Sequence, residues 1–422
     1  MSSDVKVFGM PAESGRWLFV VLGLIMNVCL GAVYAYSIFL KPVRDAFPGV
    51  SAFQANFPFM VFLAFFAVTM FFGGRIMERL GPRKLCLTGG IIVGLGWLLS
   101  SFAPNIWVLT LTYGVIAGSG VGLVYGCPVA TGAKWFPDKK GLAVGLMLAG
   151  FGGSALITGK IASIMLPSVG LSTTFMYFGI TFGIILVVLS LPFKFPKAGW
   201  VPSGWKPAAG TVVATDLTPG EMVKTGTYWG LSFCFLIGSI AGLMAIGISK
   251  PVGSEIIKIT GETAATLVGV FAIFNAAGRP LFGFLTDKIN PRNATLLNLC
   301  VIFIVSVIMI MAKEGDSLLY TISFIGFWMC LGGWLAIAPT ATGTFFGMKN
   351  YARNYGVVFF AYGLGALAPE SFDVEHENFE LGEHIGRQKV PVNFNRDGRI
   401  FPFPGPGCIK SFDHAADQAR ER

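Results

Sequence analysis

Arg279 is the residue whose type and position point most directly to chemistry. It lies inside an apolar stretch, eight residues before Asp287, which corresponds to about 12 Å along a helix. A charge within hydrocarbon is costly and usually marks a pathway for a polar solute. The planar guanidinium can bind a carboxylate through two parallel hydrogen bonds, a geometry that lysine lacks. We therefore expect Arg279 to bind a carboxylate; the alternative is an arginine that only bonds to carbonyls at a helix end.

Other polar side chains in the apolar stretches could complete a pocket around Arg279. Asn275 precedes it by one helical turn and shares its face, so Asn275 could orient the guanidinium or donate to a substrate. Tyr34, Tyr125 and Tyr362 are aromatic residues with a polar hydroxyl. Core packing would explain each tyrosine alone. Together with Arg279 they could form the amphipathic walls of a pocket for a short organic acid.

Acidic groups are missing from the apolar stretches. Every Asp and Glu lies in an expected loop or tail, and none of the three histidines lies in an expected span. We therefore expect no buried carboxylate relay for protons. Anion exchange remains open, as does symport in which the substrate or a residue at the mouth, such as Glu255 or Glu262, carries the proton.

Neither a metal, a cofactor nor an enzyme activity is expected. The seven cysteines stand singly, a spacing that suits neither a metal site nor a disulfide. No nucleophile has a base beside it. A series of glycines over 114–126 favours close helix packing over phosphate binding, because no strand precedes it.

The composition places these residues in a lipid bilayer. Hydrophobic residues make up 54% of the 422 positions and charged residues only 13%, more apolar surface than a soluble core could hide. One helical crossing needs about 20 apolar residues. We expect an all-α membrane protein with about eleven transmembrane helices. These cover 17–40, 53–77, 85–103, 107–133, 141–167, 171–193, 227–249, 263–286, 294–312, 318–346 and 352–368.

The chain divides into four expected parts. A six-helix bundle at 1–196 is followed by a cytoplasmic linker at 197–225, whose Pro, Gly, Lys and Thr content does not suit hydrocarbon. A second, incomplete helical bundle covers 226–368, and a polar tail covers 369–422.

The two bundles repeat a loop motif at an offset of about 210 residues. We expect this motif to act in gating. Its first copy consists of Gly74, Glu78, Arg79, Gly81 and Arg83. Its second copy consists of Gly283, Asp287, Lys288 and Arg292, with Asn290 in place of the second glycine. Segment 135–142 corresponds in the same way to 345–352. Two six-helix repeats that rock about a midplane site are the plan of major facilitator transporters.

The residues at 369–422 depart from the repeat. They contain all three histidines and the run FPFPGPG at 401–407, and they lack any apolar span. No twelfth helix is expected there. Either this part is a soluble tail, or the chain is a truncated or frame-altered product that lost the end of helix 11 and all of helix 12.

The distribution of Lys and Arg favours a cytoplasmic amino terminus and linker, because more of these residues then lie inside. We expect a multi-pass, monomeric protein of a bacterial-type inner membrane. The net charge of +9 fits loops that face anionic lipid, so the expected partner is the bilayer and no nucleic acid. Lys160, near a helix end, is expected to reach the interface.

Several strings resemble the oxalate/formate antiporter family of the major facilitator superfamily. They are WFPDKKGLA at 135–143, NAAGRP at 275–280 and ARNYG at 352–356, together with both copies of the gating motif. The resemblance covers about 16–368. It implies the major facilitator fold and gives Arg279 the place of the arginine that binds the substrate carboxylate. It also matches Tyr34 and Tyr125 to tyrosines that line the family's pocket.

Departures from the family pattern guide the expected substrate. Tyr362 stands where oxalate-carrying members have a second cation, a lysine. Leu331 and Leu335 stand in place of aromatic residues, and Val33 in place of a glutamine. One cation in a more apolar cavity suits a monoanion. We therefore expect a secondary transporter of lactate, formate or acetate, with protons as an open coupling ion. The alternatives are an oxalate/formate exchanger and a non-transporting sensor or inactive truncated product. In many monocarboxylate carriers an acid stands at the position of Asn275, whereas this chain has an amide there.

Overall fold

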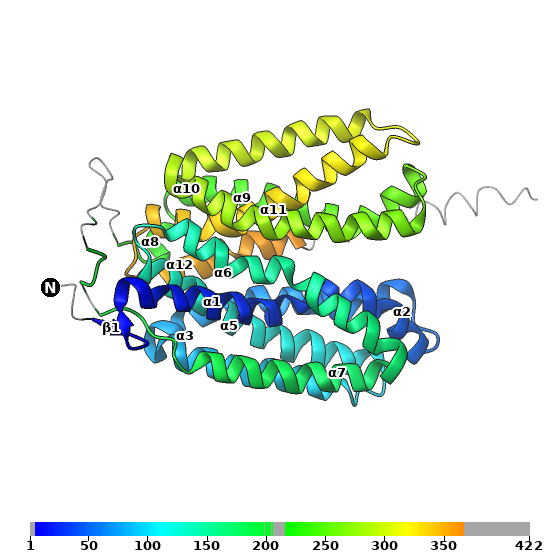
Figure 1. Ribbon diagram of the computed structural model, residues 1–422, viewed down its shortest axis with the longest axis horizontal. Helices are drawn as coiled ribbons and strands as arrows, with labels where there is room; N and C mark the ends of the chain where they lie inside the picture. Colours follow the sequence, from blue (N-terminus) through cyan, green and yellow to red (C-terminus); the bar gives the residue numbers. More distant parts are fainter. Residues whose placement is uncertain (1–4, 198, 204, 206–215, 367–422) are drawn as a thin grey trace, which may run out of the picture. The chain divides into compact units, whose positions relative to one another are not determined.

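The computed structural model describes residues 5–197, 199–203, 205 and 216–366, and nearly all of these are helical (Figure 1). The expected tail at 369–422 lies outside the described residues. The helices of the first half are α1 (Ala12–Leu30), η1 (Gly31–Ala35), α2 (Tyr36–Ala46), α3 (Ala52–Ser100), α4 (Ile106–Leu109), η2 (Thr110–Ala117), α5 (Gly118–Trp135), α6 (Lys140–Ser154), η3 (Ala155–Gly159) and α7 (Lys160–Ser190). Those that follow are α8 (Pro219–Met222), α9 (Gly226–Pro251), η4 (Val252–Ile256), α10 (Gly261–Met311), α11 (Ser317–Phe345) and α12 (Tyr351–Val358).

Polar residues fix where several helices begin. The Ser51 hydroxyl accepts a hydrogen bond from the Gln54 amide while the Gln54 side chain bonds back to Ser51, which forms a capping box before α3. Asn105 caps α4, and the hydroxyls of Thr225 and Thr260 cap α9 and α10. These side chains satisfy amide groups that the first turn of a helix leaves without partners.

A short hairpin that the sequence did not indicate precedes the first helix of this all-α fold. Strands β1 (Lys6–Val7) and β2 (Met10–Pro11) pair antiparallel, with Val7 opposite Met10. Phe8 and Gly9 form the two-residue turn, and both have positive φ angles of 54° and 77°. Such turns match the right-handed twist of a hairpin. A turn with phenylalanine at a positive-φ position gives little sequence signal.

Seven helices are long and apolar enough to cross a membrane among the described residues. Three of them contain one residue with non-helical backbone angles: Gly81 in α3, Gly170 in α7 and Asn290 in α10. Gly81 has φ 77° and ψ 165°, and Asn290 has φ 67° and ψ 161°. The left-handed φ suits glycine and is tolerated by asparagine. The two residues that align in the repeated motif therefore adopt the same unusual backbone conformation.

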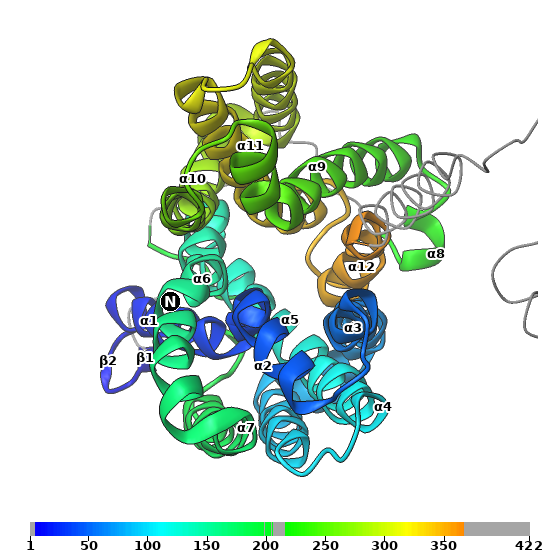
Figure 2. The same ribbon diagram turned by 90° about the vertical axis from the view of Figure 1, so that its right-hand side faces the viewer.

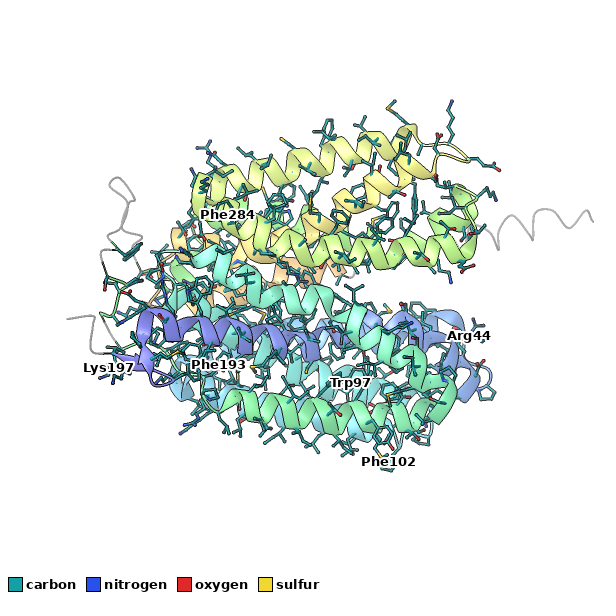
Figure 3. The ribbon with its side chains drawn as sticks, viewed as in Figure 1. Arg44, Trp97, Phe102, Phe193, Lys197 and Phe284 are labelled. Carbon is teal, nitrogen blue, oxygen red and sulfur yellow. The ribbon has the colours of Figure 1, made fainter. Side chains whose placement is uncertain are left out.

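Large apolar side chains cover the outside of the helices. Phe102, Phe303 and Ile310 are 71%, 70% and 83% exposed, whereas Trp97 is only 2% exposed. Figure 3 shows Phe102 at the outer edge of the molecule and Trp97 among the helices of the first half. A surface of this kind is unsuited to water and suited to lipid, because it would leave extensive apolar area hydrated.

The two halves of the chain meet along a few helix pairs. Figure 2 shows α10 beside α6 and α12 beside α3, in agreement with the contacts between these helices. A Cβ at Gly141 of α6 would overlap the Gly283 carbonyl oxygen of α10, and a Cβ at Gly283 would overlap that of Gly141. The two backbones therefore touch directly, which small residues at a helix interface permit.

Candidate substrate site

Arg279 lies between α10 and α6 and is fully buried. Its Nη1 donates a 2.8 Å hydrogen bond to the Leu148 carbonyl oxygen of α6, and its Nη2 donates at 3.3 Å to Oδ1 of Asn275. The guanidinium carbon lies 5.5 Å from the ring centroid of Phe151. The Nε group has no hydrogen-bond partner. A buried, charged donor is thus left over for another acceptor.

Asn275 fixes the orientation of the guanidinium. Its amide nitrogen donates at 2.9 Å to the Trp328 carbonyl oxygen of α11, and its Oδ1 accepts from Arg279. Of the two roles considered for Asn275, the geometry therefore agrees with orienting the arginine. Arg279 also bonds to a helix carbonyl, as the alternative interpretation supposed, but only through one of its nitrogens.

The tyrosines predicted around Arg279 come together from three helices. Tyr34 lies in η1, and its hydroxyl is 2.7 Å from that of Tyr362, which belongs to the helical residues 360–366. The Tyr34 side chain also lies close to the guanidinium of Arg279. Tyr125 of α5 is fully buried and contacts Phe151 edge-on at 5.4 Å. The structure thus places Tyr34, Tyr125 and Tyr362 in one cluster beside Arg279.

Aromatic residues without a distinctive sequence signal complete this cluster. Phe151 contacts Tyr34 edge-on at 5.0 Å as well as Tyr125, and Phe66 stacks on Phe151 at 5.9 Å. Phe359 stacks on Tyr362 at 4.9 Å and lies 5.6 Å from Tyr125. Phenylalanines are frequent in this chain, and nothing in their spacing distinguished these three.

A glycine makes room for the guanidinium. A Cβ at Gly152 would lie 2.6 Å from Oδ1 of Asn275 and 2.8 Å from Nε of Arg279. These separations are too short for real Cβ contacts, so any side chain at this position must displace one of the two polar groups. Gly152 therefore belongs to the site although it has no functional group of its own.

Among the described residues, the buried charged side chains are Arg16 and Arg279, with no buried carboxylate. Arg16 is already paired with Asp138 at 2.6 Å. The charge of Arg279 therefore has no acidic counterpart in its surroundings, and an anion is the ligand that its environment favours.

Part of the gating motif lies where the two halves meet at the linker end of the bundle, defined here as the end that holds Gly81, Asn290 and the described linker residues from 216 on. A Cβ at Gly74 would overlap the Ala352 carbonyl oxygen. Glu78 pairs with Arg353 of α12 at 3.6 Å. The first copy of the motif therefore contacts the start of α12, in the second half.

The second copy of the motif, in the second half, contacts the first half. The Asp287 carboxylate accepts hydrogen bonds of 2.8 and 2.9 Å from the amides of Gly141 and Leu142, in the first turn of α6. An acid at a helix start is favourable because the free amides there carry partial positive charge. Arg79, Arg83, Lys288 and Arg292 are exposed and lie outside these contacts.

Four further residues named from the sequence have the following positions. Lys160 begins α7 and is exposed. Leu331 is buried against Gly242 of α9, and Leu335 is buried in α11. Val33 is buried in η1 next to Tyr34.

The helical fold resembles those of solved membrane proteins. The solved structures that resemble it include the fucose:proton symporter FucP of E. coli in its N162A form, with a TM-score of 0.64, 14% identity and coverage of 86% of this chain and 92% of that one. The proton:xylose symporter XylE bound to 6-bromo-6-deoxy-D-glucose gives a TM-score of 0.63 at 13% identity, with coverage of 88% and 91%. At these identities the likeness concerns the fold alone.

The sequence profile of the Major Facilitator Superfamily matches residues 20–369, and the chain belongs to that superfamily. It is 31% identical over 376 residues to the oxalate:formate antiporter of Oxalobacter formigenes, covering 85% of this chain and 86% of that protein. It is 28% identical to the uncharacterized MFS-type transporter YhjX of Escherichia coli K12, covering 83% and 86%. Monocarboxylate transporter 13 of Rattus norvegicus is 32% identical over 144 residues, about a third of each chain.

These likenesses confirm the predicted resemblance to the oxalate/formate antiporter family and an integral, multi-pass membrane protein. The predictions of about eleven crossings and of an incomplete second repeat remain predictions.

Proposed function

We propose that this chain is a secondary active transporter of small monocarboxylate anions of the lactate, formate or acetate type, with Arg279 as the anion anchor. The observation that carries the proposal is a fully buried guanidinium with an unpartnered Nε and no buried acid among the described residues. Asn275 orients the anchor, and Tyr34, Tyr125 and Tyr362 supply hydroxyl donors and aromatic walls. An anion that enters this cluster gains charge-assisted hydrogen bonds and neutralises the buried charge.

Alternating access supplies the transport step. Arg279 belongs to α10 of the second half and bonds to Leu148 of α6 in the first half. The paired contacts of Glu78 with Arg353 and of Asp287 with the start of α6 hold the linker end together. We propose that these contacts open and close as the halves rock about the site.

The number of cations favours a monoanion. Two carboxylate groups would require a second buried cation beside Arg279, and Arg16, the other buried cation of the described residues, is engaged by Asp138. Oxalate/formate exchange is the alternative, supported by the 31% identity to an antiporter of that name. A sensor that binds a carboxylate without moving it is a third possibility, as is an inactive truncated product.

We further propose the membrane topology predicted above. Residues 1–196 and 226–368 form the two bundles of about eleven crossings, with the second incomplete. The amino terminus and the linker at 197–225 face the cytoplasm of a bacterial-type inner membrane, and the protein acts as a monomer. Bends at Gly81, Gly170 and Asn290 support the reading of three long helices as two crossings each.

Uptake of radiolabelled lactate into proteoliposomes tests the function. Saturable uptake is expected, and Arg279→Lys is expected to abolish it because an ammonium cannot form two parallel hydrogen bonds with a carboxylate. Arg44→Lys, at an exposed position of α2 (Figure 3), serves as the matched control. Gel filtration of each purified variant checks folding. Normal uptake by Arg279→Lys would refute the anchor.

The same vesicles separate the alternatives. An inward proton gradient tests symport, and internal formate or oxalate tests exchange. Strong counterflow driven by oxalate would favour the exchanger. Lactate binding by titration calorimetry without uptake would favour the sensor, whereas neither binding nor uptake by folded protein would favour the inactive product.

A further inference from the structure

Two tyrosines of α12 bury hydroxyl groups for which the central site gives no role. Tyr351 and Tyr355 are 1% and 2% exposed, and their rings lie 6.2 Å apart at an interplanar angle of 12°. Neither hydroxyl has a hydrogen-bond partner. The Tyr355 hydroxyl lies near that of Tyr125 without the geometry of a hydrogen bond. A buried hydroxyl without a partner is unfavourable, so a partner in another state of the protein is expected.

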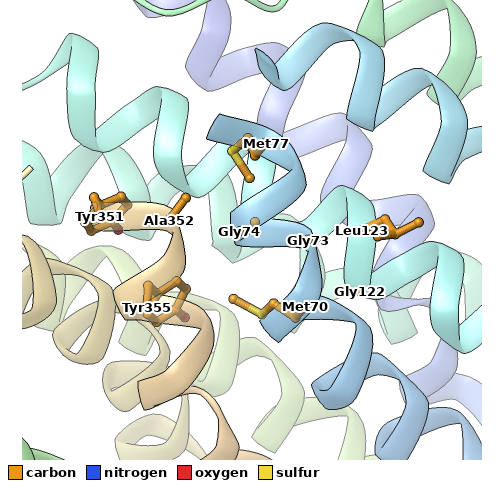
Figure 4. A pocket seen from close by; sticks show the side chains of 10 residues that line it. Met70, Gly73, Gly74, Met77, Gly122, Leu123, Tyr351, Ala352 and Tyr355 are labelled. Atoms are coloured by element: carbon orange, nitrogen blue, oxygen red, sulfur yellow. The ribbon is translucent and has the colours of Figure 1, made fainter. Parts of the chain in front are cut away.

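The two tyrosines line a small cavity between the halves. It offers about 10 Å³ to the centre of a water molecule, which is room for about one water. Figure 4 shows Tyr351 and Tyr355 on one side of the cavity and Met70 and Met77 of α3 on the other. The lining residues are Met70, Gly73, Gly74, Met77, Gly122, Leu123, Gly126, Tyr351, Ala352 and Tyr355.

A lysine side chain lies near Tyr351. Lys140 is the first residue of α6, and its Nζ would lie 3.2 Å from a Cβ at Gly343. The Tyr351 ring, through Cε2, would lie 3.2 Å from the same point. The Lys140 ammonium and the Tyr351 ring therefore both lie close to Gly343 of α11. Asp287 is the acidic group that faces Lys140, and its carboxylate is already bonded to two amides of α6.

Tyr351, Tyr355 and Lys140 provide further hydrogen-bond donors between the central site and the linker end. The ring of Phe151 lies 5.5 Å from the Arg279 guanidinium, and the ring of Tyr125 lies 5.4 Å from that of Phe151. Tyr355 is the next neighbour beyond Tyr125, and Tyr351 follows it. Tyr351 and Tyr362 are eleven residues apart, about 16 Å along a helix. Hydroxyl donors thus lie at intervals between the anchor and the end of the bundle, and Lys140 adds a cation there.

The position of the cavity ties it to gating. Tyr351 and Tyr355 come from the second half, and the α3 and α5 residues opposite them come from the first. The overlap that a side chain at Gly74 would make with Ala352 shows that the two sides now touch. Any separation of the halves at the linker end must part these surfaces, and both hydroxyls would then face the opened path.

We propose that Tyr351, Tyr355 and Lys140 form a second binding station for the substrate carboxylate, on the linker side of Arg279. The station is closed in this structure and is occupied when the linker end opens. The hydroxyls and the ammonium donate hydrogen bonds to the carboxylate as it leaves or approaches the anchor. This inference rests on the proposed transport of carboxylates.

Side-specific kinetics test the station. In oriented proteoliposomes, lactate exchange is measured while the lactate concentration is varied on one side at a time. The substitution Lys197→Cys, at an exposed position of the linker, identifies the linker side by its reaction with an impermeant maleimide. The double variant Tyr351→Phe with Tyr355→Phe is expected to raise the half-saturating concentration on the linker side at least threefold. The value for the opposite side should change less than twofold.

Matched variants exclude general effects. Tyr113→Phe removes another buried, unpartnered hydroxyl, one that lies in a separate ring cluster with Tyr36 and Trp97, and it should change neither side. Lys140→Met should also raise the linker-side value, whereas Lys139→Met, at the exposed neighbour, should not.

The possible outcomes distinguish this inference from the proposed function. Equal effects on both sides, or none, in a protein that exchanges lactate normally would overturn the station and leave the central site intact. A wild-type protein that is folded but moves no carboxylate would refute the proposed function, and the station with it.

Discussion

Arg279 of α10 donates a 2.8 Å hydrogen bond to the carbonyl oxygen of Leu148 in α6. The one fully buried arginine of the candidate site is thereby bonded to the opposite half of the protein. A substrate carboxylate that competes for this guanidinium would change a contact between the halves as well as fill a pocket. Binding and rocking would then be linked through the same side chain, because a ligand shifts a conformational equilibrium through its different contacts in the two states.

Gly152→Ala should impair transport although it removes no functional group. The new methyl group would lie 2.6 Å from Oδ1 of Asn275 and 2.8 Å from Nε of Arg279, so it must displace the anchor or the side chain that orients it. We expect lactate uptake to fall at least tenfold while membrane insertion is retained. The neighbouring Gly153→Ala is the control, since a Cβ there meets only the Cβ of Ala276 at 3.4 Å. Equal activity of the two variants would show that the position of Arg279 is not critical.

Asn275→Asp should make uptake depend on pH. The introduced carboxylate would stand beside the guanidinium that Asn275 now contacts and, when ionised, would compete with the substrate. Protonation at lower pH removes that competition, so uptake should rise as the external pH falls. The measurement is the initial rate of lactate uptake between pH 5 and pH 8, compared with the parent protein and with Asn275→Gln. A profile that follows the parent protein would contradict the placement of Asn275 beside the anion.

Asp138→Asn should destabilise the protein without acting on the substrate site. Asp138 accepts hydrogen bonds of 2.6 and 2.8 Å from Arg16, whose guanidinium also lies 4.4 Å over the ring of Phe136. Removing one partner of a largely buried pair leaves a charge unpaired and costs about 3–5 kcal/mol.

The measurement is thermal unfolding in detergent, in which Asp138→Asn should melt well below the parent protein. Lys139→Gln, at the adjacent exposed position, should melt close to it. The lactate concentration that gives half-maximal uptake by the folded protein should remain unchanged. A melting temperature equal to that of the parent would show that the pair contributes little.

Local patterns in the sequence were enough to predict the class of protein. Hydropathy identifies a helix that can enter lipid because the requirement, about 20 apolar residues with internally bonded backbone, is met within one segment. The repeated motif is also legible locally, and Gly81 and Asn290 share a left-handed φ because both occupy the same place in that motif. Arg279 was predicted as a site residue because a charge in hydrocarbon is costly.

The partners of these residues were decided only by the tertiary structure. Leu148 contributes a backbone carbonyl, Gly152 contributes empty space, and Phe151 is one of many phenylalanines, so none carries a distinctive sequence signal. Their positions depend on how closely α6 approaches α10, which Gly141 and Gly283 permit from opposite halves of the chain. Helix period and hydropathy describe one segment at a time, whereas a site between two halves is set by packing across residues more than a hundred positions apart.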